Sequence, residues 1–146
     1  MKSEPEVFSL DQLAKDQTTW WEGVRNYQAR NFMMKEMSVG DEVLFYHSNA
    51  EPSGIAGLAK VSQKAQPDVT QFDKKSETFD PKATKDNPRW HCVELQFVKK
   101  FKKFVSLPTI KSSPPLTKMI LLQKGSRLSI QPVTSAEFEF IKKLGQ

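Results

Sequence analysis

Hydrophobic and β-favouring residues gather in three stretches of this 146-residue chain, at 41–48, 55–64 and 90–104. Their alternation with polar residues, and the turn residues that bound them, predict three strands. A shorter run over 127–133 predicts a fourth strand. The pattern therefore indicates a sheet as the centre of the fold.

Capping residues predict two helices in the first quarter of the chain. Ser9, followed three residues later by Gln12, has the spacing of a capping box and predicts a short helix over 10–14. Asn26 is a favoured N-cap residue and predicts a second helix over 27–36. The residues that we expect this second helix to bury are Ala29, Phe32 and Met33.

A third helix is predicted at the C-terminal end. Thr134 and Glu137 form another capping box, so this helix begins directly after Thr134. It ends in Lys142 and Lys143, which suit a helix C-terminus, and stops at Gly145. Together with the strands, these helices predict a mixed domain in which short helices surround a curved sheet or barrel.

The remaining segments are irregular in sequence. Short helical turns are predicted over 107–111 and 116–123, with Pro114 and Pro115 interrupting them. The segment 65–89 is rich in Pro, Asp and Lys and is predicted to be a long surface excursion. Loops of that length within a small domain are usually functional or disordered.

Size and composition predict a single domain over residues 1–146 that buries its own core. The single cysteine, Cys92, excludes an internal disulfide and suits a reducing compartment, the cytoplasm of a bacterium or the nucleus of a eukaryote. No apolar run approaches the roughly 18 residues that cross a bilayer, and a charged N-terminus is unlike a secretory signal. We therefore expect no membrane partner. The net charge of +5 favours an anionic partner such as nucleic acid.

The sequence offers few catalytic or metal-binding arrangements. His47 and Ser48 are adjacent on a predicted strand, so their side chains point to opposite faces, and the same holds for His91 and Cys92. Two histidines and one cysteine far apart in sequence have no zinc-ligand spacing. No metal and no cofactor are therefore expected.

The run Lys99-Lys100-Phe101-Lys102-Lys103-Phe104 alternates positive charge with aromatic rings. Such a run could be a nucleic-acid surface. It could equally be a solvated edge strand whose lysines discourage pairing with another strand. Because charge runs are usually solvated faces, the edge-strand interpretation is favoured.

The stretch from Trp20 to Asn31 combines aromatic rings, guanidinium groups and carboxamides around a single glycine. Rings for stacking beside planar hydrogen-bonding groups are what a pocket for a nucleobase requires. A structural explanation stands beside this one for each residue. The aromatic residues Trp21, Tyr27 and Trp90 could be core residues, and for Trp90 this is the favoured interpretation. Asn26 could be purely an N-cap, and Arg30 could pair with a loop carboxylate.

Several motifs in this chain resemble those of the EVE domain family. They span nearly the whole chain in the family's order. The matching segments are 2–5 (KSEP), 21–31 (WEGVRNYQARN), 45–49 (FYHSN), 54–57 (GIAG), 71–73 (QFD), 88–90 (PRW) and 127–133 (RLSIQPV).

This resemblance implies an α+β fold of the PUA-like type, a twisted β-barrel with short surrounding helices. It also implies a non-enzymatic module that binds DNA or RNA and recognises a modified base, a cytosine or adenine derivative. The base would be flipped out of the nucleic acid into a pocket beside the barrel.

The same resemblance implies which residues form the pocket. Trp21 would be the stacking platform, Val24 would contact an added methyl group, and Glu4 would accept a hydrogen bond from an exocyclic amine. Arg25, Asn26 and Arg30 would hold the base edge or a phosphate. Residues 71–73 would cover the mouth of the pocket. The expected pocket residues are Ser3, Glu4, Trp21, Val24, Arg25, Asn26, Arg30, Tyr46, His47, Ser48, Gln71, Phe72, Asp73 and Trp90.

Two other functions stay open at this point. The chain could be a hydrolase of a modified nucleoside, as some ASCH-type relatives are, with Lys2 and Glu4 as the acid–base pair. Alternatively, the polar cluster could only brace the sheet of a structural module.

Overall fold

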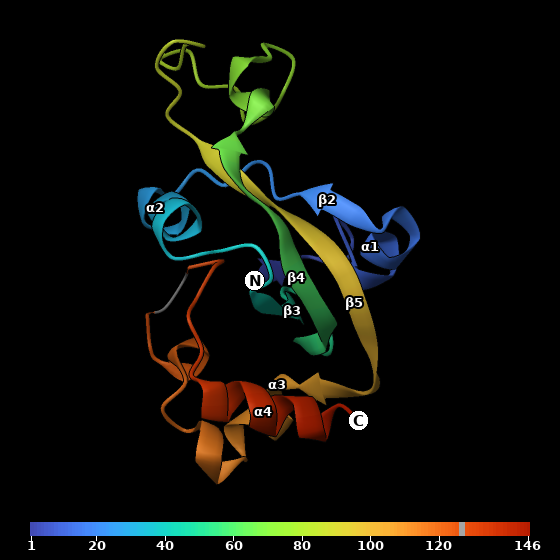
Figure 1. Cartoon of the computed structure of the whole chain (residues 1–146). Helices are drawn as coiled ribbons and strands as arrows, with labels where there is room; N and C mark the ends of the chain where they lie inside the picture. The colour runs from blue at the N-terminus through green and yellow to red at the C-terminus, as the bar shows by residue number, and fades with distance from the viewer. Residues whose placement is uncertain (126–127) are drawn as a thin grey trace. The chain divides into compact units, whose positions relative to one another are not determined.

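Two long strands, β4 (Gly54–Pro67) and β5 (His91–Ser106), form the centre of the fold and run beside each other in opposite directions (Figure 1). The computed structural model describes residues 1–125 and 128–146. The chain divides into two compact units, and both strands pass from one unit to the other. Unit 1 comprises Met1–Gln17, Glu42–Ala59 and Phe97–Gln146, and unit 2 comprises Thr18–Asp41 and Lys60–Gln96.

The sheet is mixed and has five strands in the order β1-β3-β4-β5-β2. In unit 1, β1 (Lys2–Ser3) pairs in parallel with β3 (Glu42–His47). In unit 2, β2 (Thr18–Trp20) pairs antiparallel with the start of β5, and Trp20 lies opposite Glu94. Together with this sheet, the α-helices found in residues 1–125 and 128–146 make an α+β protein, as predicted.

Unit 1 has a continuous hydrophobic core beneath its part of the sheet. Leu44, Ile55 and Phe101 contribute to it from three different strands. The helices of this unit are α1 (Leu10–Asp16), α3 (Leu107–Lys111) and α4 (Ser135–Leu144), with two short 3₁₀ turns, η2 (Pro114–Leu116) and η3 (Ile120–Leu122). Burial of both faces of β4 in this unit explains why residues 54–59 are all buried.

Unit 2 contains the helix α2 (Tyr27–Lys35) and the 3₁₀ turn η1 (Val69–Phe72). Ala29 and Met33 are the buried residues of α2, whereas Phe32 is only half-buried. The loop from η1 to β5 returns the chain to Trp90, which is itself buried. This loop carries Asp80 and Arg89, which are described below.

The capping signals give accurate helix starts. The side chains of Ser9, Asn26 and Thr134 each accept a backbone N–H at the start of a helix, and Thr134 forms the full capping box with Glu137. The three strands predicted over 41–48, 55–64 and 90–104 are present as β3, β4 and β5, and β4 and β5 are each longer than predicted. The helix α1 also continues two residues beyond its predicted end.

Three predictions for the irregular segments need correction. Residues 65–67 belong to β4, and Asp68 and Gln71 are buried, so 65–89 is not only a surface excursion. Residues 128–133 form no strand, and Arg127 lies outside the described residues. The helical turn predicted over 107–111 is present as α3, but Pro114 and Pro115 do not only separate the two predicted turns: they begin η2, because proline fits the first position of a helical turn.

The lysine-rich run from Lys99 to Phe104 lies within β5 in unit 1. Phe101 is buried, while Phe104 is 40% exposed and the lysines point to solvent. The strand β2 pairs with β5 only at residues 94–96, so it does not cover this run. The lysines therefore form a solvated face, as favoured above, although β5 lies between β4 and β2 in the sheet and is not itself an edge strand.

Candidate nucleic-acid interface

An exposed tyrosine stacked on a buried tryptophan is the central feature of unit 2. The ring centroids of Tyr27 and Trp90 are 4.8 Å apart, and the ring planes are inclined by 23°. Tyr27 begins α2 directly after the N-cap Asn26 and is 46% exposed. Trp90 is 6% exposed, and its indole Nε1 donates to Asp80 at 2.7 Å. The buried ring therefore fixes the orientation of the exposed one.

Three guanidinium groups surround this pair of rings. Arg30 lies 4.7 Å from the centroid of Tyr27, and Arg25 lies 5.3 Å from a ring centroid of Trp90. Arg89 lies 5.7 Å from the Tyr27 ring and also donates to its hydroxyl. Cations over aromatic faces stabilise the arrangement and bring positive charge to this part of the surface.

A buried carboxylate, Asp68, anchors Arg25 from below. Its Oδ2 accepts from the Arg25 guanidinium at 3.0 Å and from the Gly23 amide at 2.8 Å, while its Oδ1 accepts from the amide and hydroxyl of Thr70. Burial alone would raise the pKa of Asp68, but these hydrogen bonds together outweigh it and lower the pKa below its ordinary value. The carboxylate thus stays ionised and holds the start of the polar stretch in place.

Gly23 is required at its position in this network. It has a φ of 87°, in the left-handed region that residues with a side chain rarely adopt. In this conformation the Gly23 amide donates to the Asp68 carboxylate at 2.8 Å. The single glycine of the polar stretch is thus explained by local geometry.

The Gln71 side chain braces the backbone. It is fully buried, its Nε2 donates to the carbonyls of Asp68 and Trp90, and its Oε1 accepts from the amides of Arg89 and Trp90. A residue with all these bonds positions Arg89 and Trp90 and does not cover a pocket mouth. The role predicted for Gln71 is therefore corrected, whereas Phe72 is half-buried and Asp73 is exposed.

Arg30 is held by uncharged groups. It donates to the carbonyl of Arg89 at 2.8 Å and to the carboxamide of Asn31 at 2.8 Å. Among the described residues it forms no ion pair, so the carboxylate partner considered above is not found. Because its charge is not neutralised, Arg30 is available to an anionic ligand.

Trp21 differs from its prediction. Its side chain is 9% exposed and belongs to the hydrophobic core, so it is not an open stacking platform. Trp21 directly follows Trp20, the last residue of β2, and consecutive residues of an extended backbone point to opposite sides, so only one of the two rings can face the core. Val24 is half-buried and Asn26 is exposed, and Asn26 does act as the N-cap of α2.

The other predicted pocket residues lie in unit 1, on β1, on β3 and next to them. The Ser3 hydroxyl donates to the carbonyl of Phe8 at 2.6 Å, and Glu4 accepts weakly from Asn49 at 3.4 Å. His47 Nε2 accepts from the Leu10 amide at 3.1 Å, and burial lowers the pKa of this imidazole. The Ser48 amide donates to the carbonyl of Ser3 at 2.9 Å.

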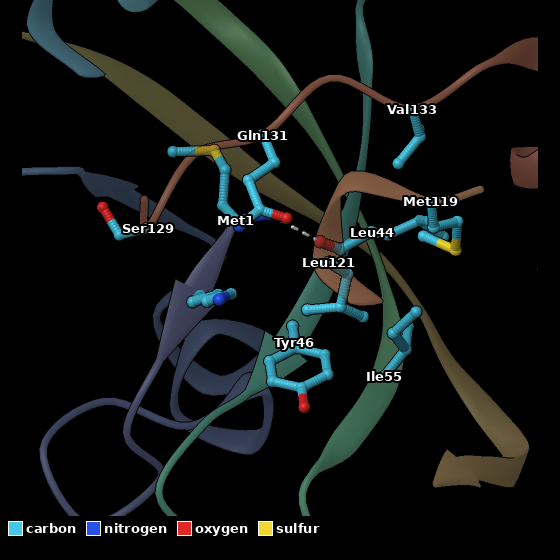
Figure 2. Close-up of a pocket in the computed structure, with 10 residues that line it drawn as sticks. Met1, Leu44, Tyr46, Ile55, Met119, Leu121, Ser129, Gln131 and Val133 are labelled. Carbon is cyan, nitrogen blue, oxygen red and sulfur yellow. Dashed lines mark hydrogen bonds between the residues drawn. The ribbon is translucent and has the colours of Figure 1, made fainter. Parts of the chain in front are cut away.

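Tyr46 lines a small cavity in unit 1 together with apolar residues from several elements (Figure 2). The cavity has a volume of about 40 Å³ and is mostly apolar. Small-molecule sites occupy roughly 300–1,000 Å³, so this cavity is too small for a base. The labelled residues that line it are Met1, Leu44, Tyr46, Ile55, Met119, Leu121, Ser129, Gln131 and Val133.

Sequence reasoning missed two residues of the aromatic and guanidinium cluster. Neither is among the expected pocket residues: Tyr27 enters the sequence analysis as one ring of the stretch 20–31, with the core as its alternative, and Arg89 enters as part of the segment 88–90. A signal for Tyr27 exists in the sequence, because the first residue after an N-cap lies at an exposed helix end. For Arg89, the pairing of Arg and Trp next to a predicted strand was the available signal.

Among the described residues, no three His, Cys, Asp or Glu side chains gather into a group that could hold a metal ion. The described helices include none that is long and apolar enough to cross a membrane. Neither finding changes the interpretation of the cluster.

Comparisons with known proteins identify the relatives of this chain. The model of the EVE domain matches residues 1–144. Human thymocyte nuclear protein 1 is 45% identical over 99% of this chain and 72% of its own length. A crystal structure of a Pseudomonas putida protein has a TM-score of 0.95 at 44% identity, covering 100% of this chain and 97% of that one.

One further solved structure is informative about ligands. It is the human THYN1 protein in complex with DNA containing 5-methylcytosine, with a TM-score of 0.92 at 45% identity, covering 100% of this chain and 95% of that one. In that structure the human relative is bound to DNA that contains 5-methylcytosine. With a family model over nearly its full length and these relatives, the chain belongs to the EVE domain family.

Proposed function

We propose that this chain is a non-enzymatic module that binds nucleic acid carrying a modified base, with modified cytosine as the first candidate and modified adenine as the second. The observation that carries the proposal is the exposed Tyr27 ring, backed by Trp90 and surrounded by three guanidinium groups. A flat ring supplies stacking and the guanidinium groups supply phosphate contacts or bidentate hydrogen bonds. The complex of human THYN1 with 5-methylcytosine DNA supports the same ligand class.

The arginines of this cluster differ in their partners and therefore in their proposed roles. Arg25 is tied to Asp68 and has a structural part, whereas Arg30 has only uncharged partners. We propose that Arg30 contacts the nucleic acid directly and that Tyr27 stacks on a base. The proposal keeps the remaining predicted pocket residues, which include Ser3, Glu4, Tyr46, His47 and Ser48 in unit 1. It also keeps the expectation that residues 1–146 act as one module.

A neighbouring nitrogen is consistent with a ligand in this region. His91 Nδ1 is buried and has no hydrogen-bond partner among the described residues. Burial lowers the pKa of His91, and the charge of Arg30 lowers it further, so the imidazole is kept neutral. In a neutral imidazole each ring nitrogen either donates or accepts one hydrogen bond, so the unpartnered Nδ1 can make one hydrogen bond to a base edge.

The test is a binding measurement by fluorescence anisotropy at physiological salt. Labelled oligonucleotides with 5-methylcytosine or unmodified cytosine, single- and double-stranded, are titrated with the wild type, Tyr27→Ala and Tyr27→Phe. Loss of a stacking platform predicts binding that is roughly 5- to 100-fold weaker for Tyr27→Ala, corresponding to about 1–3 kcal/mol. Tyr27→Phe keeps the ring and should bind nearly as the wild type does.

Lys82→Ala removes an exposed lysine of the same unit and is the matched control for charge. If the wild type binds modified and unmodified DNA equally, the selectivity for a modified base is wrong. If Tyr27→Ala binds as tightly as Lys82→Ala, the cluster is not the contact surface.

A further inference from the structure

Unit 2 contains a second hollow that shares no residue with the predicted base pocket. It has a volume of about 290 Å³, close to the lower limit of roughly 300 Å³ for small-molecule sites. A single planar ring system with its substituents is the kind of ligand that fits this size. The residues that line it are Trp20, Glu22, Gln66, Pro67, Val69 and Cys92.

The pairing of β2 with β5 explains why these side chains share one side of the sheet. Trp20 lies directly opposite Glu94, and directly opposed residues project from the same face. Cys92 precedes Glu94 by two residues on β5 and therefore shares that face. After β2 the chain turns tightly, since the Glu22 amide donates to the Trp20 carbonyl at 2.8 Å. The turn sends Trp21 into the core and leaves Glu22 at the cavity.

Glu22 is the charged side chain that lines this cavity. Within the described part of the chain, no hydrogen bond or ion pair involves its carboxylate, and the residue is exposed. Burial raises its pKa, as does the nearby charge of Asp68, while Arg25 opposes them. A donor from a ligand would therefore be favourable at this carboxylate.

The remaining lining groups are apolar or neutral. Cys92 is buried, and burial with nearby carboxylates raises the pKa of its thiol to about 12, so it is not a nucleophile. Val69, on η1, is 67% exposed and offers an apolar wall at the rim. Trp20 is half-buried and presents part of its ring surface to the cavity.

A cation lies on the same face of β4. The Ser62 hydroxyl donates to Glu94 at 2.8 Å, which places Ser62 on the face that carries Trp20. Residues at intervals of two share a face of a strand, so Lys64 and the cavity residue Gln66 lie there as well. Lys64 is exposed and forms no ion pair among the described residues. One face of the sheet thus carries an aromatic ring that can stack on a base, a hydrogen-bond acceptor and an unpaired cation that can contact a phosphate. These are the groups that a nucleotide-binding site needs.

We propose that this cavity is a second base subsite, which takes an unmodified nucleobase with an amino group at C4 of a pyrimidine or C6 of a purine, that is, cytosine or adenine. Trp20 stacks on the base, Glu22 accepts from the amino group, and Lys64 is placed for the phosphate. The inference rests on the proposed function only in taking nucleic acid as the partner. A carboxylate acceptor rejects thymine and uracil, which offer a carbonyl at the same edge position.

The test follows the indole N–H signal of Trp20, identified with Trp20→Phe, in ¹⁵N–¹H spectra of the full chain. The ligands are cytidine, adenosine, uridine and the unmodified hexamers of deoxycytidine and thymidine. Cytidine, adenosine and the cytosine hexamer should shift the Trp20 signal, whereas uridine and the thymidine hexamer should not. Free nucleosides and hexamers together distinguish a nucleoside site from one that needs a strand.

Two variants and one control complete the experiment. Trp20→Ala should weaken binding of cytidine about 10-fold or more, as loss of a stacking ring does. Glu22→Gln, which keeps the side-chain shape, should remove the preference for cytidine over uridine. Lys74→Ala, an exposed lysine of the same unit, should change neither.

Several outcomes would overturn the subsite. One is a shift caused by tetramethylammonium ion without any shift caused by cytidine, since the site would then recognise an ammonium group through Trp20 and Glu22. Another is an unchanged preference for cytidine in Glu22→Gln. If the wild type binds 5-methylcytosine DNA through Tyr27 but cytidine leaves Trp20 unchanged, only the subsite is wrong. If it binds no nucleic acid at all, the proposed function fails too.

Discussion

The Tyr27 ring lies on the Trp90 ring with centroids 4.8 Å apart, and Trp90 is in turn tied to Asp80 through its indole N–H. The stack therefore joins the first turn of α2 to the loop before β5 within unit 2. Offset-stacked rings at this distance stabilise each other by about 0.5–1.5 kcal/mol beyond their buried area. The exposed ring is thereby held ready for a ligand without a cost of ordering it on binding.

The hydrogen bond from Trp90 to Asp80 should control the pKa of that carboxyl. This bond is the largest cause that lowers the pKa of Asp80, followed by the amide of Lys82. Trp90→Phe keeps a ring beneath Tyr27 but removes the N–H donor, so the pKa of Asp80 should rise toward its ordinary value. Titration of the Asp80 carboxyl by ¹³C spectroscopy measures this, and an unchanged pKa in Trp90→Phe would contradict the assignment. Tyr27→Phe serves as the control and should leave Asp80 as it is.

Asp68 should contribute to stability in a pH-dependent way. Its pKa is lowered in the folded protein, so its contribution is fully present above about pH 5 and is lost as the pH falls through about 4 toward the folded value. Asp68→Asn removes the buried negative charge that pairs with Arg25 and places an NH₂ group among the hydrogen-bond donors around residue 68. We expect it to lower the free energy of unfolding by about 3–5 kcal/mol near neutral pH. Urea unfolding of both proteins between pH 3 and pH 7 should show this difference, and it should shrink below about pH 4. A difference that stays constant over the whole range would rule out the ionised network.

The elements with strong local signals were predictable from the sequence. The N-cap residues Ser9, Asn26 and Thr134 predict where α1, α2 and α4 begin, because an N-cap depends only on residues within one helical turn. The central strands were predictable for a similar reason. By contrast, the ends of β4 and β5 depend on pairing between strands far apart in sequence, and both strands continue further than their hydrophobic patterns.

The candidate site was less predictable for a physical reason. The polar stretch contains Trp20, Trp21 and Tyr27, and the sequence does not state which ring faces the core. The structure buries Trp21, while Trp20 lies at a cavity and Tyr27 lies on the surface. Likewise, nothing local predicts that Gln71 is buried, because its four hydrogen bonds go to backbone groups on two separate segments.

Trp21→Ala should mainly affect stability. The side chain is 9% exposed, so truncation leaves a cavity in the core and should cost about 3–5 kcal/mol of unfolding free energy. Tyr27→Ala, at an exposed position, should cost much less and is the matched comparison. Urea unfolding monitored by circular dichroism measures both. If Trp21→Ala were as stable as Tyr27→Ala, the ring would not be a core residue, and its role as a stacking platform would return.

Gly57→Ala should destabilise unit 1. A Cβ at this position would meet the carbonyl oxygen of Lys99 in β5 and the Leu10 side chain, and the backbone contact cannot move aside. Overpacking of this kind costs about 1–3 kcal/mol, and contact with a strand backbone places Gly57 at the upper end. Gly40→Ala is the control, since a Cβ there meets nothing within 4 Å and only its φ of +94° is unfavourable. Equal losses for the two variants in thermal unfolding would show that close packing of β4 on β5 is not the cause.

His47 should be a neutral imidazole with its proton on Nδ1. Its Nε2 accepts from the amide of Leu10, the first residue of α1, and this leaves Nδ1 as the only nitrogen that can carry the proton at neutral pH. Burial lowers the pKa of His47, as does Lys100, although Asp11 opposes them. A lowered histidine pKa gives stability that is present above about pH 6.5 and is lost as the pH falls through the folded value. In His47→Ala the Leu10 amide loses its partner, so α1 should be destabilised by about 1–3 kcal/mol at pH 7.5, with a smaller difference near pH 5. Long-range ¹⁵N spectra identify the tautomer directly. A proton on Nε2 would contradict the hydrogen bond to Leu10, and any ligand of His47 would then have to be recognised through Nδ1 as an acceptor instead of as a donor.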